Sequence, residues 1–136
     1  MTEAEIAEDR VRGLARADGL ARILGIEFVA GGPGTVTLAM TVTDDHLNFF
    51  GKGHGGAIFA LADAAFGLAS NSHGRDAIGI DAHIAYVGGV EKGTRLVAVA
   101  TEVSRANRVA VYRIEVKGEN NAAVATFTGT VYIPKR

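Results

Sequence analysis

The stretch that decides the fold is Gly53-His54-Gly55-Gly56-Ala57-Ile58-Phe59-Ala60-Leu61-Ala62-Asp63-Ala64-Ala65-Phe66. From Ala57 to Ser70 the residues are apolar on nearly every side and leave no polar stripe, which predicts a helix surrounded by protein. We expect this central helix to cover about residues 55–73, and Asp63 is its only charged residue. A lone carboxylate in a buried helix is the first candidate for chemistry.

The segments around the central helix predict one sheet and one further helix. Apolar residues at helical spacing favour an amphipathic helix over about residues 3–24. Alternating apolar residues predict strands, which we place at 26–30, 35–42, 77–87, 95–103, 109–116 and 124–133. One sheet wrapped around one hydrophobic helix, an α+β fold whose last four strands form a meander, is the economical arrangement. Because a helix covers only one face of a sheet, we expect a partner subunit on another surface.

Length and composition narrow the class of protein. The 136 residues suit a single domain over 1–136. The 14 Lys and Arg balance 15 Asp and Glu, which argues against nucleic acid as a partner. The chain has no cysteine, so disulfide and thiolate chemistry are excluded and a cytoplasmic location is expected. No stretch predicts a signal peptide or a membrane span.

The glycines at the start of the central helix favour a site for a carbonyl oxygen. The first amides of a helix have no partner within it and carry the positive end of its dipole. Gly55 and Gly56 let a ligand approach the backbone closely. An amide there polarises a carbonyl and stabilises an oxyanion. The alternative is that these glycines only allow the chain to turn into the helix.

Asp63 suits a general base, because burial raises the pKa of a carboxyl group. The alternative is a structural Asp that bonds a neighbour or a helix end. Gly55 and Asp63 are separated by about 12 Å along a helix axis. If both act on one substrate, two copies of the helix have to run antiparallel in a homodimer, which creates two equivalent sites.

The loop before the helix adds further candidates. Asn48 is placed to hold a water molecule or a carbonyl group, and His54 to hold the helix start, to orient a ligand or to transfer protons. Phe49 and Phe50 are candidates for an aromatic pocket, whereas Phe59 and Phe66 are expected to pack in the core.

Other chemistries lack support in the sequence. The remaining histidines have no spacing typical of a metal site; they are His46, His73 and His83. The chain also lacks a nucleophile elbow, a phosphate-binding loop and a dinucleotide fingerprint. We therefore expect neither a metal nor a cofactor.

These motifs resemble those of the hotdog-fold thioesterases, most of all the phenylacetyl-CoA thioesterase branch of the PaaI type. The resemblance rests on Leu47-Asn48, on the stretch from His54 to Phe66, and on Ala69-Ser70-Asn71-Ser72. It implies an antiparallel sheet around the central helix, a dimer with a continuous sheet and a dimer of dimers. It also implies an acyl-CoA substrate at the dimer interface.

The resemblance assigns roles to individual residues. Asp63 is similar to the family's catalytic carboxylate, as base or nucleophile, and Gly55 to the residue whose amide binds the oxyanion. His54 and Gly56 lie beside that amide, and Asn48 is similar to the residue that positions the attacking water. The implied substrate is phenylacetyl-CoA or hydroxylated phenylacetyl-CoA. Medium-chain acyl-CoA hydrolysis, non-catalytic acyl-CoA binding, and hydration or dehydration of acyl-CoA or acyl-ACP stay open as alternatives.

Two positions depart from the family pattern. Gly67 stands where relatives often carry a hydroxyl residue, so a helper such as Ser70 is expected instead. Val87-Gly88-Gly89 replaces an arginine-proline pair near the expected CoA entrance. The candidate cations for the CoA phosphates are Lys92, Arg95, Arg105 and Arg108, although arginines at turns are often only solvated.

Overall fold

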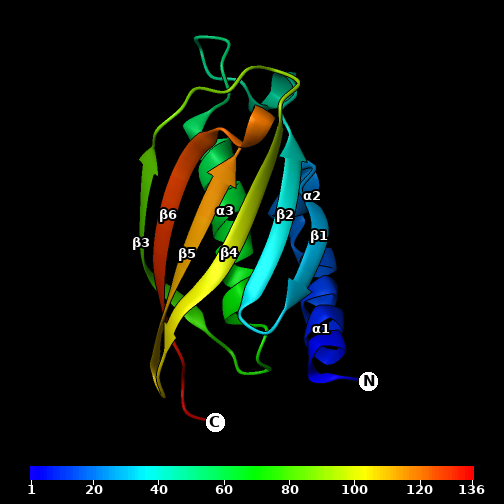
Figure 1. Cartoon of the computed structure of the whole chain (residues 1–136), viewed down its shortest axis with the longest axis vertical. Coiled ribbons are helices and arrows are strands. Elements are labelled where there is room, and N and C mark those ends of the chain that lie inside the picture. The colour runs from blue at the N-terminus through cyan, green and yellow to red at the C-terminus, as the bar shows by residue number, and fades with distance from the viewer.

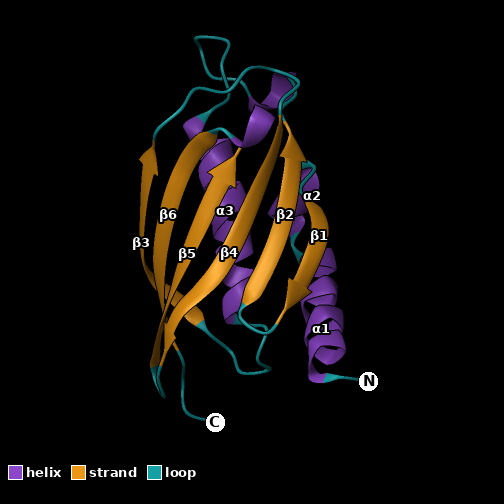
Figure 2. Cartoon of the chain, viewed as in Figure 1, coloured by secondary structure: helices purple, strands orange, loops and turns teal.

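The computed structural model describes all 136 residues as one six-stranded antiparallel sheet with helices on one side. The helices are α1 (Glu3–Ala17), α2 (Gly19–Leu24) and α3 (Gly55–Ser70). The strands are β1 (Glu27–Gly32), β2 (Thr35–Thr41), β3 (Ile78–Tyr86), β4 (Arg95–Arg105), β5 (Val109–Lys117) and β6 (Ala123–Tyr132). Short 3₁₀ turns cover Asp44–His46 and Glu119–Asn121. The sheet wraps around α3, as the sequence predicted (Figures 1 and 2). None of the helices combines the length and apolarity needed to cross a bilayer.

The order of the strands corrects the predicted meander. The sheet order is β1-β2-β4-β5-β6-β3, so β4, β5 and β6 form a meander but β3 does not join it in sequence order. The chain leaves β2, passes through α3 and reaches the far edge of the sheet, where β3 pairs with β6. Alternation along a strand identifies the strand but carries no information about its neighbours, which explains the error.

The expected helix over residues 3–24 is two helices that meet at Asp18. Asp18 has extended backbone angles, φ −80° and ψ 103°. Its side chain accepts a hydrogen bond from the Ala21 N–H at 3.1 Å and caps α2. Aspartate favours this N-cap position because it satisfies an amide that the helix cannot. The helical spacing of apolar residues continues across the break, which hid it from the sequence analysis.

The central helix ends at Ser70, three residues before the predicted end. The Asn71 side chain donates to the Gly67 carbonyl at 2.8 Å and to the Ala77 carbonyl at 3.1 Å. Its oxygen also accepts from the Ala77 N–H at 2.9 Å. Asn71 therefore ends α3 and ties that end to the residue before β3.

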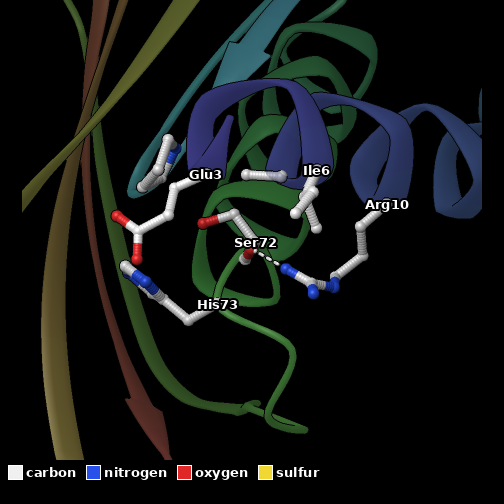
Figure 3. A pocket seen from close by; sticks show the side chains of 7 residues that line it. Glu3, Ile6, Arg10, Ser72 and His73 are labelled. Carbon is white, nitrogen blue, oxygen red and sulfur yellow. Dashed lines mark hydrogen bonds between the residues drawn. The ribbon is translucent and has the colours of Figure 1, made fainter. Parts of the chain in front are cut away.

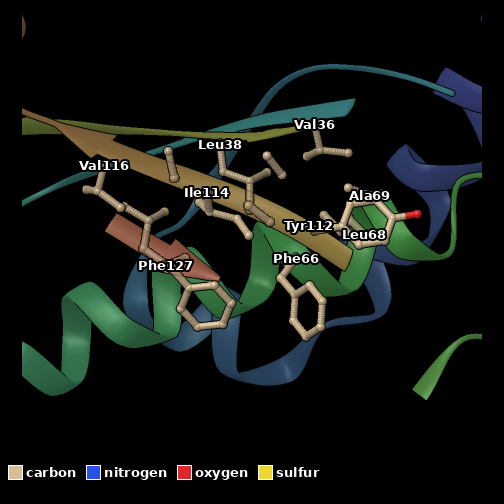
Figure 4. Packing of buried hydrophobic residues seen from close by; sticks show 14 of the residues in the cluster. Val36, Leu38, Phe66, Leu68, Ala69, Tyr112, Ile114, Val116 and Phe127 are labelled. Carbon is tan, nitrogen blue, oxygen red and sulfur yellow. The ribbon is translucent and has the colours of Figure 1, made fainter. Parts of the chain in front are cut away.

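The core lies between α3 and the inner face of the sheet. The Phe66 ring contacts Tyr112 and Phe127, with ring centroids 6.1 and 5.5 Å apart (Figure 4). A Cβ atom added to Gly129 would lie 2.7 Å from the same ring, so this glycine on β6 makes room for Phe66. Phe59 packs edge-on against Phe127 at 5.4 Å. Both phenylalanines thus belong to the core, as predicted.

One edge of the sheet is open. Strand β3 pairs with β6 on one side and has no partner strand on the other. Its apolar side chains Ile78, Ile80 and Tyr86 are 55%, 60% and 50% exposed. An edge with unpaired backbone groups and exposed apolar residues favours association with another chain.

Candidate active site

The N-terminus of α3 presents one free backbone amide. His54 is the N-cap, and its Nδ1 atom accepts the Gly56 N–H at 2.8 Å. The proton of the neutral ring therefore lies on Nε2. The His54 carbonyl accepts the N–H groups of Ala57 and Ile58, both at 3.1 Å. The Gly55 N–H has no acceptor within the chain, so it is the amide that remains available to a ligand.

Tyr86 fixes the turn that carries this amide. Its hydroxyl, at the end of β3, donates to the Gly55 carbonyl at 2.9 Å. A Cβ atom at position 55 would lie 3.2 Å from Tyr86 Cζ. Partial burial raises the pKa of the Tyr86 hydroxyl, so it stays protonated and able to donate. Tyr86 could not be predicted from the sequence, because a tyrosine in a strand carries no sign of such a contact.

Asn48 organises the loop before α3. Its side-chain oxygen accepts from the N–H groups of Phe50 and Lys52 at 2.9 and 3.1 Å. The backbone of Asn48 also donates to the Lys52 carbonyl at 2.7 Å. The oxygen is thus held by the loop, which leaves the amide NH₂ of the side chain for a ligand.

Phe49 and Phe50 extend from this loop into solvent. They are 92% and 75% exposed, and their ring centroids are 4.5 Å apart. The loop projects beyond the end of the sheet in Figure 1. Because both rings are mostly exposed in one chain, their predicted role in an aromatic pocket stays a prediction that requires a second chain.

His46 has a structural position. It is 5% exposed, its Nδ1 accepts from the Thr43 N–H at 2.9 Å and its Nε2 donates to the Leu24 carbonyl at 2.8 Å. Its own carbonyl accepts the His54 N–H at 2.7 Å. His46 therefore connects the end of α2 to the start of α3.

Asp63 lies on the one face of α3 that the rest of the chain leaves exposed. Gly56 and Gly67 share this face, so the prediction of a helix surrounded on all sides was wrong for the single chain. Partial burial raises the pKa of Asp63, and the nearby negative charge of Asp18 raises it further. Asp63 and Gly55 are about 12 Å apart along the helix, so they do not meet within one chain.

A groove runs from His54 between α2 and α3. Apolar side chains line it along both helices, namely Leu20, Leu24, Ala57 and Ala60. Its remaining walls are Asp45, His46, His54 and Gly56. The groove therefore places an aliphatic surface beside His54 and Gly56, the residues on either side of Gly55.

The other predicted ligand-binding residues lie at both ends of α3. Ser70 is buried, and its hydroxyl donates to the Gly67 carbonyl at 3.1 Å. Arg105 and Arg108 lie at the β4–β5 hairpin, beyond the opposite end of α3 (Figure 1). Lys92 and Arg95 are paired with Asp44 at 2.8 Å and with Glu27 at 3.1 Å. One chain does not bring Ser70, Arg105 or Arg108 to Gly55. Lys92 belongs to a loop at the Gly55 end, since the Val90 carbonyl of that loop accepts the Gly53 N–H at 2.8 Å. The roles of all these residues stay predictions.

The C-terminal end of α3 carries a polar cluster that the sequence analysis missed. The Glu102 carboxylate accepts from Tyr112 at 2.6 Å and from His73 at 2.8 Å. Burial opposes the ionisation of Glu102, but these two hydrogen bonds and the charges of His73 and Arg105 hold its pKa below the usual value. Burial and the Glu102 charge raise the pKa of Tyr112.

A hollow beside this cluster is separate from the groove. Its lining includes Glu3, Arg10 and His73 (Figure 3). The Arg10 guanidinium is committed to the Ser72 carbonyl at 2.6 Å. The hollow touches neither Gly55 nor Asp63, so we place the candidate active site at the other end of α3.

Comparison with known proteins identifies the family. Residues 50–125, which include α3, β3, β4 and β5, match the model of the thioesterase superfamily. The chain belongs to this family. The predicted hotdog fold, with the antiparallel sheet packed on the central helix, is confirmed.

Three relatives of this thioesterase are informative. Acyl-coenzyme A thioesterase PaaI of Escherichia coli is 35% identical over 112 residues, or 82% of this chain and 80% of that protein. The structure of E. coli PaaI superimposes with a TM-score of 0.95 over 98% of this chain and 97% of that one, at 30% identity. PaaI of Thermus thermophilus is 41% identical, with a TM-score of 0.82 over 85% and 98% of the two chains. A Streptococcus mutans protein in complex with acetyl CoA is 30% identical. Its structure superimposes with a TM-score of 0.78 over 82% of this chain and 90% of that one.

Proposed function

We propose that this thioesterase hydrolyses acyl-CoA thioesters and prefers phenylacetyl-CoA or a hydroxylated phenylacetyl-CoA. The observation that carries the proposal is the free Gly55 N–H at the start of α3, on a helix whose exposed face holds Asp63. The E. coli relative named acyl-coenzyme A thioesterase and the S. mutans relative with bound acetyl CoA support CoA as the thiol carrier.

In the proposed reaction the thioester carbonyl oxygen accepts the Gly55 N–H. As a water molecule attacks the carbonyl carbon, the carboxylate of Asp63 takes a proton from that water. The negative charge that develops on the carbonyl oxygen is stabilised by the Gly55 amide and by the helix dipole. Collapse of the tetrahedral intermediate breaks the C–S bond, and the CoA thiolate receives the proton. Asn48 and His54 orient the water and the ester. Direct attack by Asp63, with a mixed anhydride that water then hydrolyses, is the alternative for the same residue.

The Gly55 amide and the Asp63 carboxylate of one site are proposed to come from different chains. Along one helix they are about 12 Å apart, which is too far for one thioester carbonyl group. Two α3 helices that run antiparallel bring Gly55 of one chain to the partner subunit's Asp63. The open edge of β3 supports such a dimer with a continuous sheet, and two dimers are proposed to form the tetramer.

Asp63→Asn tests the proposed chemistry. The variant keeps the shape of the side chain but not its basicity, so kcat is expected to fall by about 10²- to 10⁴-fold. Release of free CoA from a panel of aryl- and alkyl-acyl-CoA substrates, followed with a thiol reagent, measures it. CoA affinity and thermal stability serve as controls for folding. Full activity of the variant would contradict the role of Asp63.

The same panel decides the acyl group. The aliphatic lining of the groove, with Leu20 and Leu24, favours medium-chain acyl groups as the second candidate. A higher kcat/KM for phenylacetyl-CoA than for octanoyl-CoA supports the preferred proposal, and the reverse supports the alternative. Binding without release of CoA from any substrate would indicate a non-catalytic binding protein.

A further inference from the structure

Two hydrogen-bonded anchors fix how the N-terminal helices lie along α3. At one end the Arg10 guanidinium donates to the Ser72 carbonyl, just past the end of α3 (Figure 3). At the other end His46 bonds the Leu24 carbonyl, and His54 donates to the His46 carbonyl. The chain from residue 10 to residue 24 therefore runs antiparallel to α3. Between the anchors α2 lies against α3, because Leu20 of α2 and Ala60 of α3 line the same groove. Asp18 and Asp63 are the next acids along the two helices toward the Arg10 anchor, so they lie at the same level.

We propose that Asp18 is a positioning residue, whose carboxylate, held at the start of α2, strengthens Asp63 as the base of the reaction. This inference rests on the proposed function of Asp63. Asp18 itself does not touch the substrate and acts only through the second carboxylate.

The Asp18 carboxylate is fixed in place at the start of α2. It accepts the Ala21 N–H at 3.1 Å and stands at the N-terminus of α2, where a negative charge is stabilised. A carboxylate held in this way opposes the ionisation of a neighbouring carboxyl group. Burial is the larger cause of the raised pKa of Asp63, and the charge of Asp18 adds to it. A base with a higher pKa takes a proton from water more readily.

No cation forms an ion pair with Asp18 or Asp63; the Arg22 guanidinium lies beside the start of α2, 3.7 Å from a Cβ atom placed on Gly19. Arg22 donates to the Arg16 carbonyl at 3.0 Å, and both arginines line the hollow between α1, α2 and β1. Arg10 is bound to the Ser72 carbonyl beyond the end of α3. Asp63 forms no ion pair with any of them.

The remaining charged and titratable groups lie away from Asp63. Asp45, His46 and His54 stand at the Gly55 end of the groove. On β3, Tyr86 points to Gly55, and alternation places Asp81 and His83 on the opposite face of the strand. The other strands contribute to the core that covers the buried face of α3, the face opposite Asp63. Asp18 is therefore the charge that acts on Asp63 within the chain.

Asp18→Asn tests the inference, because asparagine also caps a helix but carries no charge. We expect the acidic limb of the pH profile of kcat/KM to move to lower pH. The ratio of kcat/KM at acidic pH to that at pH 8 then rises by about two- to fivefold. The KM and the Tm are expected to stay unchanged, since Asp18 binds no substrate and the cap is kept.

Two variants serve as controls. Asp18→Glu keeps the charge and is expected to keep the profile of the unmodified protein. Asp9→Asn removes an exposed acid from α1 and is expected to leave the profile unchanged. A shift of equal size in Asp9→Asn, or an unshifted profile in Asp18→Asn, would overturn the inference.

A measurement without substrate separates this inference from the proposed function. Carbon-13 NMR titration of the Asp63 carboxyl group reports its pKa directly, and Asp18→Asn is expected to lower it. No change in that pKa overturns the role of Asp18, whatever the activity. A lowered pKa together with an active Asp63→Asn variant overturns the proposed function instead, and with it the catalytic consequence of Asp18.

Discussion

Single side chains that cap helix ends position the groups of the candidate site. His54 caps α3 through Gly56 and thereby leaves the Gly55 amide free. Asp18 caps α2 and places a charge near Asp63. The sequence made His54, Gly55 and Asp63 candidates, because a glycine pair and a lone acid stand out in an apolar segment. It could not identify Tyr86 or Asp18, since their contacts join segments that are distant in the chain.

Glu102 provides a test at this scale. Its pKa is lowered in the folded protein. A lowered carboxyl pKa adds stability that is complete above the unfolded value of about 4.3 and is lost as the pH falls through the folded value. Glu102→Gln is therefore expected to lower the free energy of unfolding by about 1–2 kcal/mol at pH 7 and by less near pH 3. Urea denaturation at both pH values measures the difference. An equal loss at both would show that the charge is unimportant.

The element that matters most is α3, and its two faces explain which predictions held. The face with Leu61, Ala65 and Phe66 packs on the sheet, as its composition predicted. The opposite face is also composed of small or apolar residues apart from Asp63, so composition could not show that it is exposed in a single chain. The order of the strands around α3 was likewise unpredictable, because β3 pairs with β6, which is the last strand in the chain and not its neighbour in sequence.

Gly55→Pro tests the role of the helix start. Proline lacks the N–H group and fits the first position of a helix. His54 already has the extended angles, φ −71° and ψ 132°, that a residue before proline adopts. We expect kcat to fall by about 10²- to 10³-fold.

Gly55→Ala is the matched control for this variant. It adds a Cβ atom near Tyr86 Cζ, at 3.2 Å, as proline does, but it keeps the N–H group. If both variants lose activity equally, the crowding of Tyr86 and not the amide is responsible.

At the scale of the whole molecule, we propose that the single chain is completed by a partner subunit. The open edge of β3, the exposed Phe49 and Phe50, and the exposed face of α3 are all surfaces that one chain leaves uncovered. The helical distance between Gly55 and Asp63 was enough to predict from the sequence that one chain holds halves of two sites. That prediction still requires a test of the assembled protein.

Mixing two inactive variants provides this test. Subunits with Asp63→Asn retain Gly55, and subunits with Gly55→Pro retain Asp63. A dimer of one of each contains one site with both groups intact, so co-refolding is expected to restore up to about half of the activity per mixed dimer. Each variant refolded alone is the control. If the mixture stays inactive although mixed dimers form, the site does not combine the two chains.

The hydrogen bond from Tyr86 to Gly55 has a thermodynamic consequence. It joins the turn that holds the free amide to β3, the strand whose outer edge is open. A second strand that pairs with that edge restrains β3, and through Tyr86 it restrains the amide. Subunit association and ligand affinity are then linked, and linkage is reciprocal. A ligand that binds at the amide tightens the assembly by the same factor by which assembly tightens the ligand.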